Sequence, residues 1–205
     1  EVGPSWHKSK QGTPTMGGLM FILGIAVAMI VCLPVFYSLG IDETLLLKAK
    51  AFAGLGMAVA FGVIGFMDDY ISILKKRNLG LTERQKLVLQ FAVAAAYLAS
   101  VAMAGGGTST IIPFVGQINL GLFYYPLAAV VIVGIVNAVN FTDGIDGLNT
   151  TVSFFAFLSL ALCAGILSMT GLSALGLASA AACIGFLIWN WHPAKVFMGD
   201  TGSLF

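Results

Sequence analysis

The sequence predicts an all-α protein, a polytopic bundle of transmembrane helices with a polar active site at one membrane face. Hydrophobic residues make up 59% of the chain and charged residues only 9%, and the mean hydropathy is +0.97. Because soluble domains contain about 25% charged residues, a bilayer is the expected solvent. The apolar runs are long and continuous, which favours helices over a barrel of short alternating strands.

The spans follow from the apolar runs, since a membrane-crossing helix needs about 20 predominantly apolar residues. Residues 87–142 and 147–194 carry no charge, and the polar stretches "AGGGTST" and "SMTGLS" divide each of them into two spans. Between the first two, "IIPFVGQINLGLF" predicts a small hairpin outside the bilayer. The six expected spans are residues 16–39, 51–67, 86–104, 122–139, 150–168 and 173–191.

The basic residues indicate which ends of these spans face the cytoplasm. Alternation places residues 1–15, 68–85, 140–149 and 192–205 on one side of the membrane. Eight of the ten Lys and Arg residues lie in or at the edge of these segments, so the positive-inside rule makes that side cytoplasmic. The net charge of +1, without a basic patch, gives no indication of nucleic-acid binding.

Most of the acidic residues fall on the same face. Solvation of loops would account for any one of them, but not for the whole set, because the opposite loops hold only Asp42 and Glu43. We therefore expect three distant segments to bring carboxylates to one surface. The five residues are Asp68, Asp69, Asp143, Asp146 and Asp200.

Three motifs surround these carboxylates. "GFMDDY" places two aspartates side by side, where a divalent cation would relieve their repulsion. "NAVNFTDGIDGLN" and "NWHPAKVFMGDTGSL" combine Asp, Asn and Gly, which suits either a capped turn between helices or a hydrogen-bonding site for a polar ligand or metal. Carboxylate oxygens together with substrate phosphates are the ligands that Mg²⁺ prefers.

A fourth motif, "KSKQGTPTMGG", precedes the first span. Its lysines, glycines and threonines could present charge, backbone N–H groups and hydroxyls to a phosphate. A basic loop that obeys the positive-inside rule is an almost equally good interpretation of this stretch alone. Together the four motifs predict phosphate chemistry at a membrane surface, where positioning and charge neutralisation matter more than covalent machinery.

In this order, the four motifs resemble those of the polyprenyl-phosphate N-acetylhexosamine-1-phosphate transferases, and most closely the phospho-N-acetylmuramoyl-pentapeptide transferase branch of that superfamily. The resemblance implies a single integral-membrane domain of ten helices, of which residues 1–205 would supply six, without the first helix and the last few. The superfamily's His-rich cytoplasmic motif is not among these residues, so recognition of the donor sugar has no support here.

The resemblance also implies a reaction in the bacterial cytoplasmic membrane. UDP-N-acetylmuramoyl-pentapeptide would give its phospho-sugar to undecaprenyl phosphate, with Mg²⁺ as cofactor, releasing UMP and forming the lipid intermediate of peptidoglycan synthesis known as lipid I. The resemblance leaves undecided whether the protein forms a homodimer. The alternatives are a UDP-N-acetylglucosamine-1-phosphate transferase on the same lipid and, more remotely, an ion-coupled transporter. The transporter is disfavoured because the acids cluster at helix ends and no matching pair of broken helices is visible.

Carried over by motif, the resemblance assigns roles to individual residues. Asp200 would be the metal ligand with Asp68 and Asp69 beside it, and these three would be the catalytic residues. Two routes stay open: direct attack by the lipid phosphate, which we favour, and a covalent phosphoryl-aspartate. The expected substrate-binding residues are Lys8, Lys10, Thr13, Asn140, Asp143, Asp146, Asn190, Phe197, which would stack on the uracil, and Gly199.

Overall fold

The computed structural model describes residues 13–41, 43–75 and 80–205. Within that part of the chain, six helical segments are long and apolar enough to cross a membrane, which confirms the predicted fold class. The helices are α1 (Gly18–Ser38), α2 (Leu45–Lys48), the π-helical turn η2 (Ala49–Ala53), α3 (Gly54–Lys75), α4 (Glu83–Met103), η3 (Gly121–Phe123), α5 (Tyr124–Thr142), α6 (Leu148–Ile166), α7 (Thr170–Asn190) and α8 (Gly199–Ser203).

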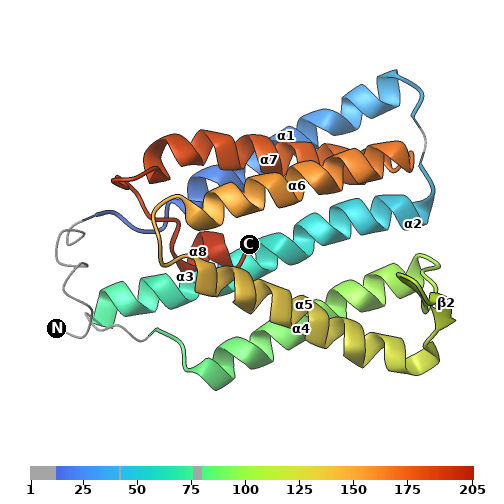
Figure 1. Cartoon of the computed structure of the whole chain (residues 1–205), viewed down its shortest axis with the longest axis horizontal. Coiled ribbons are helices and arrows are strands. Elements are labelled where there is room, and N and C mark those ends of the chain that lie inside the picture. Colours follow the sequence, from blue (N-terminus) through green and yellow to red (C-terminus); the bar gives the residue numbers. More distant parts are fainter. Residues whose placement is uncertain (1–12, 42, 76–79) are drawn as a thin grey trace.

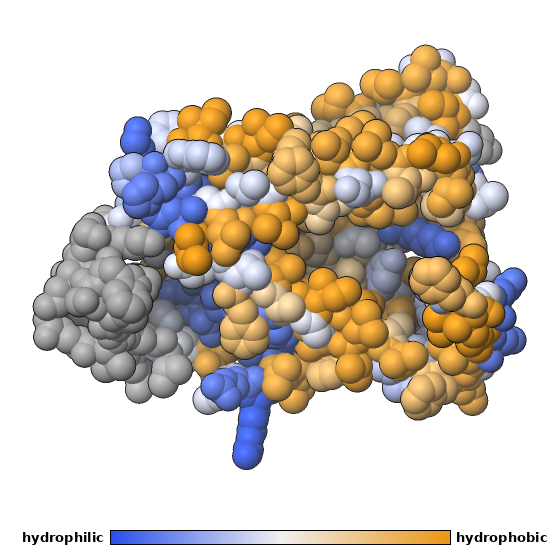
Figure 2. Space-filling view, viewed as in Figure 1, coloured by the Kyte–Doolittle hydropathy of each residue, from blue (hydrophilic) through white to orange (hydrophobic). Residues whose placement is uncertain are grey.

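The helices form two layers, with the short helix α8 between them (Figure 1). One layer contains α6, α7 and α1, where α7 packs against both of the others, and the second contains α3, α4 and α5. The core of the second layer includes Phe61 and Ile64 of α3, Ala94 of α4 and Val133 of α5, and Leu204, just after α8, packs into it. Orange, apolar side chains cover most of the flank in Figure 2, as expected for helices whose outer faces contact lipid.

Two helix ends differ from the expected boundaries in a way that matters for the site. The second span was expected to stop at residue 67, but α3 continues to Lys75, so Asp68 and Asp69 lie on its last turns. The helix α4 begins with a capping box, in which the Thr82 hydroxyl accepts a hydrogen bond from Gln85 N and the Gln85 side chain accepts one from Thr82 N. Such a cap satisfies backbone donors at the helix start and places Lys86 on the first turn.

The predicted hairpin between α4 and α5 is also present. Strands β1 (Ser109–Ile112) and β2 (Gly116–Asn119) pair antiparallel, at the ends of α4 and α5 that lie away from α8 (Figure 1).

Candidate active site

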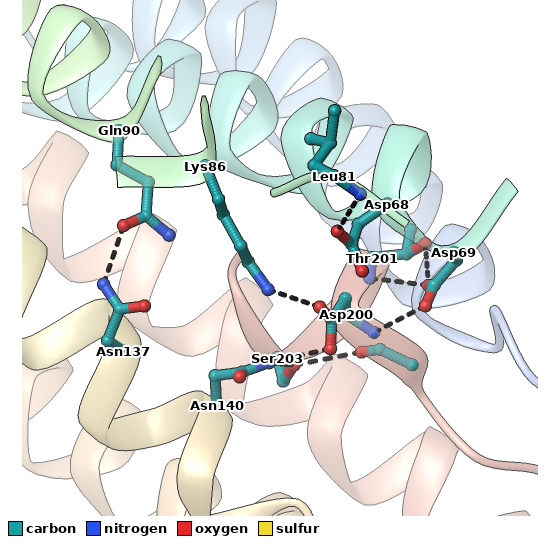
Figure 3. Close-up of polar contacts among 11 residues, drawn as sticks. Asp68, Asp69, Leu81, Lys86, Gln90, Asn137, Asn140, Asp200, Thr201 and Ser203 are labelled. Atoms are coloured by element: carbon teal, nitrogen blue, oxygen red, sulfur yellow. Dashed lines mark hydrogen bonds and ion pairs between the residues drawn. The ribbon is translucent and has the colours of Figure 1, made fainter. Parts of the chain in front are cut away.

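Asp200, the second residue of α8, is the centre of a polar network to which four helices contribute (Figure 3). Lys86 Nζ of α4 forms an ion pair with Asp200 Oδ2. Asn140 Nδ2 of α5 donates to Asp200 Oδ1 at 3.0 Å and to Ser203 Oγ at 2.7 Å. We call Asp200 with Asp68, Lys86 and Asn140 the Asp200 centre.

Asp69 holds the beginning of α8. Its Oδ1 accepts a hydrogen bond from Asp200 N at 3.2 Å, and its Oδ2 accepts from Thr201 N at 2.9 Å and from Thr201 Oγ1 at 2.7 Å. Free backbone N–H groups at a helix start attract a carboxylate. Asp69 therefore positions α8, and with it Asp200, and both of its oxygens are already engaged.

Asp68, the neighbour of Asp69, faces different partners. Its Oδ1 accepts a hydrogen bond from Leu81 N at 2.8 Å, which ties α3 to the segment that leads into α4. Its side chain is also a hydrogen-bonding partner of the Asp200 carboxyl. Two carboxyls this close repel each other unless a proton or a cation lies between them.

Small residues allow α8 to lie this close to the long helices. A Cβ atom on Gly65 of α3 would overlap the carbonyl group of Asp200, and one on Gly18 of α1 would overlap the backbone of Gly202. Glycine is therefore required where α3 and α1 meet α8.

The pKa values of two carboxyl groups in this region shift in opposite directions. Burial alone would raise the pKa of Asp200, but hydrogen bonds from Lys86 and Asn140 hold that pKa below its usual value. Burial, followed by the charges of Asp200 and Asp69, raises the pKa of Asp143 to about 7. Among the described residues, the carboxyl groups of the site outnumber the cation paired with them, Lys86, which favours binding of a positive ion.

A second polar cluster joins the loop before α6 to the loop after α7. Asn190 is buried; its Oδ1 accepts from Gly147 N at 3.1 Å and from Thr150 Oγ1 at 2.8 Å, and its Nδ2 donates to Val196 O at 3.0 Å. Asn149 Nδ2 contacts Met198 Sδ at 3.3 Å. We call the contacts of Asn190, Thr150 and Asn149 the loop clasp.

The remaining expected site residues lie near these two clusters. Asp146 Oδ2 accepts from Ala194 N and contacts His192 Nδ1, each at 3.1 Å, so Asp146 also ties the two loops together. The segment after Thr13 runs beside Phe197, because Phe197 N donates to Pro14 O and Gly17 N donates to Phe197 O, both at 2.9 Å. Gly199, with a φ of +68°, starts α8 against the Asp69 carboxylate. Lys8 and Lys10 lie outside the described residues.

Sequence reasoning missed two residues of this region. Lys86 was counted only among the basic residues of the cytoplasmic face, although it forms the ion pair with Asp200. Gln90, one turn further along α4, is fully buried, and its Oε1 accepts from Asn137 Nδ2 at 2.7 Å. The capping box at Thr82 was the available signal, since it fixes where α4 starts and which side chains share a face.

Across the described residues, no three His, Cys, Asp or Glu side chains are grouped so as to hold a metal ion. The chemistry of the donors still fits Mg²⁺ in part, because the carboxyls of Asp68 and Asp200 are adjacent and oxygen ligands suit this ion. Both oxygens of Asp200 already have side-chain partners, Lys86 and Asn140. Those of Asp69 hold the backbone at the start of α8, so a metal at Asp69 would have to release that helix start. The expected role of Asp69 as a metal ligand stays a prediction.

Comparison with known proteins agrees with the motifs. The signature of phospho-N-acetylmuramoyl-pentapeptide-transferases matches residues 10–22. Proteins named phospho-N-acetylmuramoyl-pentapeptide-transferase from Halalkalibacterium halodurans and Bacillus subtilis are each 43% identical over 205 residues, which is 100% of this chain and 61% of theirs. The protein of the same name from Desulforamulus reducens is 44% identical over 207 residues, which cover 98% of this chain and 59% of that relative.

The chain thus spans about three fifths of the length of these curated relatives. The family described as glycosyl transferase family 4 matches residues 51–205, a range that includes Asp68, Asp69, Lys86 and Asp200. From this match over most of its length, the chain belongs to glycosyl transferase family 4.

Proposed function

We propose that this protein transfers phospho-N-acetylmuramoyl-pentapeptide from its UDP-linked donor to undecaprenyl phosphate, releasing UMP and forming lipid I. The observation that carries the proposal is the Asp200 centre, in which carboxyls from α3 and α8 meet Lys86 of α4 at one end of apolar helices. A transfer between a polar nucleotide sugar and a membrane-bound phosphate needs a charged site at the membrane surface, where both substrates can reach it. The names of the relatives supply the sugar, and the reaction is assigned to the cytoplasmic face of the bacterial inner membrane because the basic residues gather there.

Mg²⁺ is the proposed cofactor, and Asp200 and Asp68 are the residues that would hold it. When bound, it would supply positive charge to neutralise the phosphates. Asp69 acts by fixing α8 through its three hydrogen bonds.

The protein's own groups favour direct attack by the lipid phosphate. A phosphate monoester has a second pKa of about 6, so its oxygen is already largely deprotonated near neutral pH and needs little general-base help. That oxygen attacks the phosphorus that carries the sugar, and the bond to UMP breaks. The main obstacle is repulsion between the two anions, which Lys86 counters with its positive charge. Asp68 orients the acceptor phosphate or takes its residual proton.

The experiment that tests this proposal follows UMP release by the purified protein in detergent, with undecaprenyl phosphate and Mg²⁺. We expect release from UDP-N-acetylmuramoyl-pentapeptide but not from UDP-N-acetylglucosamine, and loss of release with EDTA. Release from the second donor alone would reassign the protein to the N-acetylglucosamine branch. Release from neither would contradict the proposal.

The route is tested separately, by incubating the protein with the UDP-linked donor in the absence of lipid acceptor. Direct attack predicts that no aspartate becomes phosphorylated and that no UMP is released. A trapped phosphoryl-aspartate would overturn this route in favour of the covalent one.

A further inference from the structure

The hairpin between α4 and α5 carries an unusual set of exposed side chains. Its register pairs Thr110 with Ile118 and Ile112 with Gly116, and residues 113–115 form the turn. Large apolar side chains surround this turn, and each of them is exposed. We call these residues, Ile111, Ile112, Phe114 and Val115, the apolar tip.

The surroundings of the tip match the boundary of a bilayer. The hairpin joins two candidate membrane spans, α4 and the segment Gly121–Thr142, and no charged residue occurs between Lys86 and Asp143. Exposed Met103, Leu122 and Phe123 flank it. The neighbouring Tyr124 and Tyr125 are of the type enriched at membrane–water interfaces.

The orientation of the hairpin keeps the tip near that boundary. In Figure 1 the hairpin lies across the ends of α4 and α5 rather than continuing along their axes. Figure 2 shows orange, apolar surface at this end of the molecule, with blue, hydrophilic side chains at its outermost edge. The exposed apolar residues at the adjoining ends of the two spans, Met103, Leu122 and Phe123, lie beside the hairpin in sequence.

The backbone at Phe114 follows the tight turn and leaves its side chain without protein contacts. Its φ is +68°, in the left-handed region that glycine and asparagine adopt readily and bulky residues rarely do. The aromatic ring is nevertheless fully exposed and has no large protein surface to contact. Left-handed backbone is common in short hairpin turns, so the turn accounts for this φ, and the ring gains no packing from the protein in return.

We propose that the apolar tip inserts into the lipid leaflet on the side of the membrane opposite the Asp200 centre. The partner is the lipid itself, at the boundary between head groups and acyl chains. The depth is limited by the backbone, because the outer edges of β1 and β2 are unpaired in a two-stranded sheet and open edges do not enter the hydrocarbon core. The hairpin, expected from sequence to lie outside the bilayer, would instead anchor the α4–α5 pair in the interface.

The test places an environment-sensitive fluorophore at the tip of the purified protein in phosphatidylethanolamine–phosphatidylglycerol vesicles. Cys32, Cys163 and Cys183 are replaced by Ala, and NBD is attached to Phe114→Cys or, as a second tip position, to Val115→Cys. The matched control is Gly107→Cys at the base of the same hairpin, where an added side chain meets open space. Quenching is measured with nitroxide lipids labelled at a shallow or a deep acyl position and with aqueous iodide.

The tip probes are expected to lose most of their intensity to the shallow nitroxide, less to the deep one, and little to iodide. The Gly107 probe should be quenched less by lipid and more by iodide than the tip probes. Quenching of the tip by iodide alone would overturn the proposal. Protection from both quenchers would also overturn it, because the tip would then be covered by protein, from a second copy or from another segment.

Discussion

The Asp200 centre and the loop clasp are built from similar-looking motifs, yet they differ in how completely their polar groups are satisfied. In the clasp, all the hydrogen bonds of Asn190 join neutral groups of the protein, and the residue is buried. In the Asp200 centre, the carboxyls of Asp68 and Asp200 face each other, and the nearby Asp143 has a raised pKa of about 7.

This difference distinguishes polar residues that stabilise the fold from polar residues that take part in the reaction. A buried polar group that is fully paired contributes to stability and specifies one arrangement of the chain. Carboxyls held together without enough counter-charge cost stability, and such sites are where ligands and reactions are found. Substitutions in the Asp200 centre should therefore affect turnover, and those in the loop clasp should affect unfolding.

The largest effect is expected for Asp68→Asn. The amide retains an oxygen to accept from Leu81 N and gains an N–H that can donate to Asp200, so the fold is kept while a negative charge is lost. We expect turnover, measured as UMP release, to fall about 100-fold or more, with no decrease in the midpoint of thermal unfolding without Mg²⁺. A large drop in that midpoint would show that Asp68 contributes to folding stability rather than to turnover alone.

The next effect concerns the close approach of α3 to α8. Gly65→Ala places a Cβ where the Asp200 carbonyl group lies, so α8 must move, and a displacement of this order costs about 100-fold in rate. The control is Gly56→Ala in the same helix, where an added Cβ meets nothing within 4 Å.

Gly56→Ala should leave the rate unchanged and stabilise the helix by up to about 1 kcal/mol. Equal rates for the two variants would show that α8 tolerates the shift and that the close contact is unrelated to catalysis.

A smaller effect is expected from the titration of Asp143. With its pKa raised from 3.8 to about 7, the folded protein holds this proton after the unfolded chain has lost it. Stability associated with the group is therefore complete below pH 3.8 and is lost as the pH rises to about 7. Asp143→Asn should remove this part of the pH dependence in thermal unfolding with EDTA, so that its advantage over the parent grows across this window.

Repeating this thermal-unfolding comparison with Mg²⁺ in place of EDTA tests for a metal at the Asp200 centre. A cation at the Asp200 centre would lower the pKa of Asp143 and shrink the difference between Asp143→Asn and the parent. An unchanged difference would count against a metal at this position.

The smallest effect is expected in the loop clasp. Thr150→Val removes the hydroxyl that donates to Asn190 and should lower the free energy of unfolding by about 1 kcal/mol, with turnover almost unchanged. Thr150→Ser keeps the hydroxyl and should behave like the parent in denaturant unfolding. A loss of turnover in Thr150→Val without a loss of stability would extend the active site to the clasp.

Sequence patterns were enough to predict the helices and the face on which the acids gather, because apolar periodicity and charge placement depend on short stretches. The pairing of Lys86 with Asp200 was not predictable, since it joins residues 114 positions apart and depends on how α4 packs beside α8. The different roles of Asp68 and Asp69 were equally hidden. Adjacent residues on a helix point in different directions, and only the position of α8 decides which one it meets.

The bonds from α8 to Asp69 have a consequence for inhibitor design. Although the chain shows two neighbouring acids, a cationic compound directed at this end of the protein would find a usable counter-charge in Asp68 and not in Asp69. A compound with two positive groups spaced for the adjacent pair would have to compete with the helix for Asp69. A single cation directed at Asp68, beside the Asp200–Lys86 pair, is the better pharmacophore.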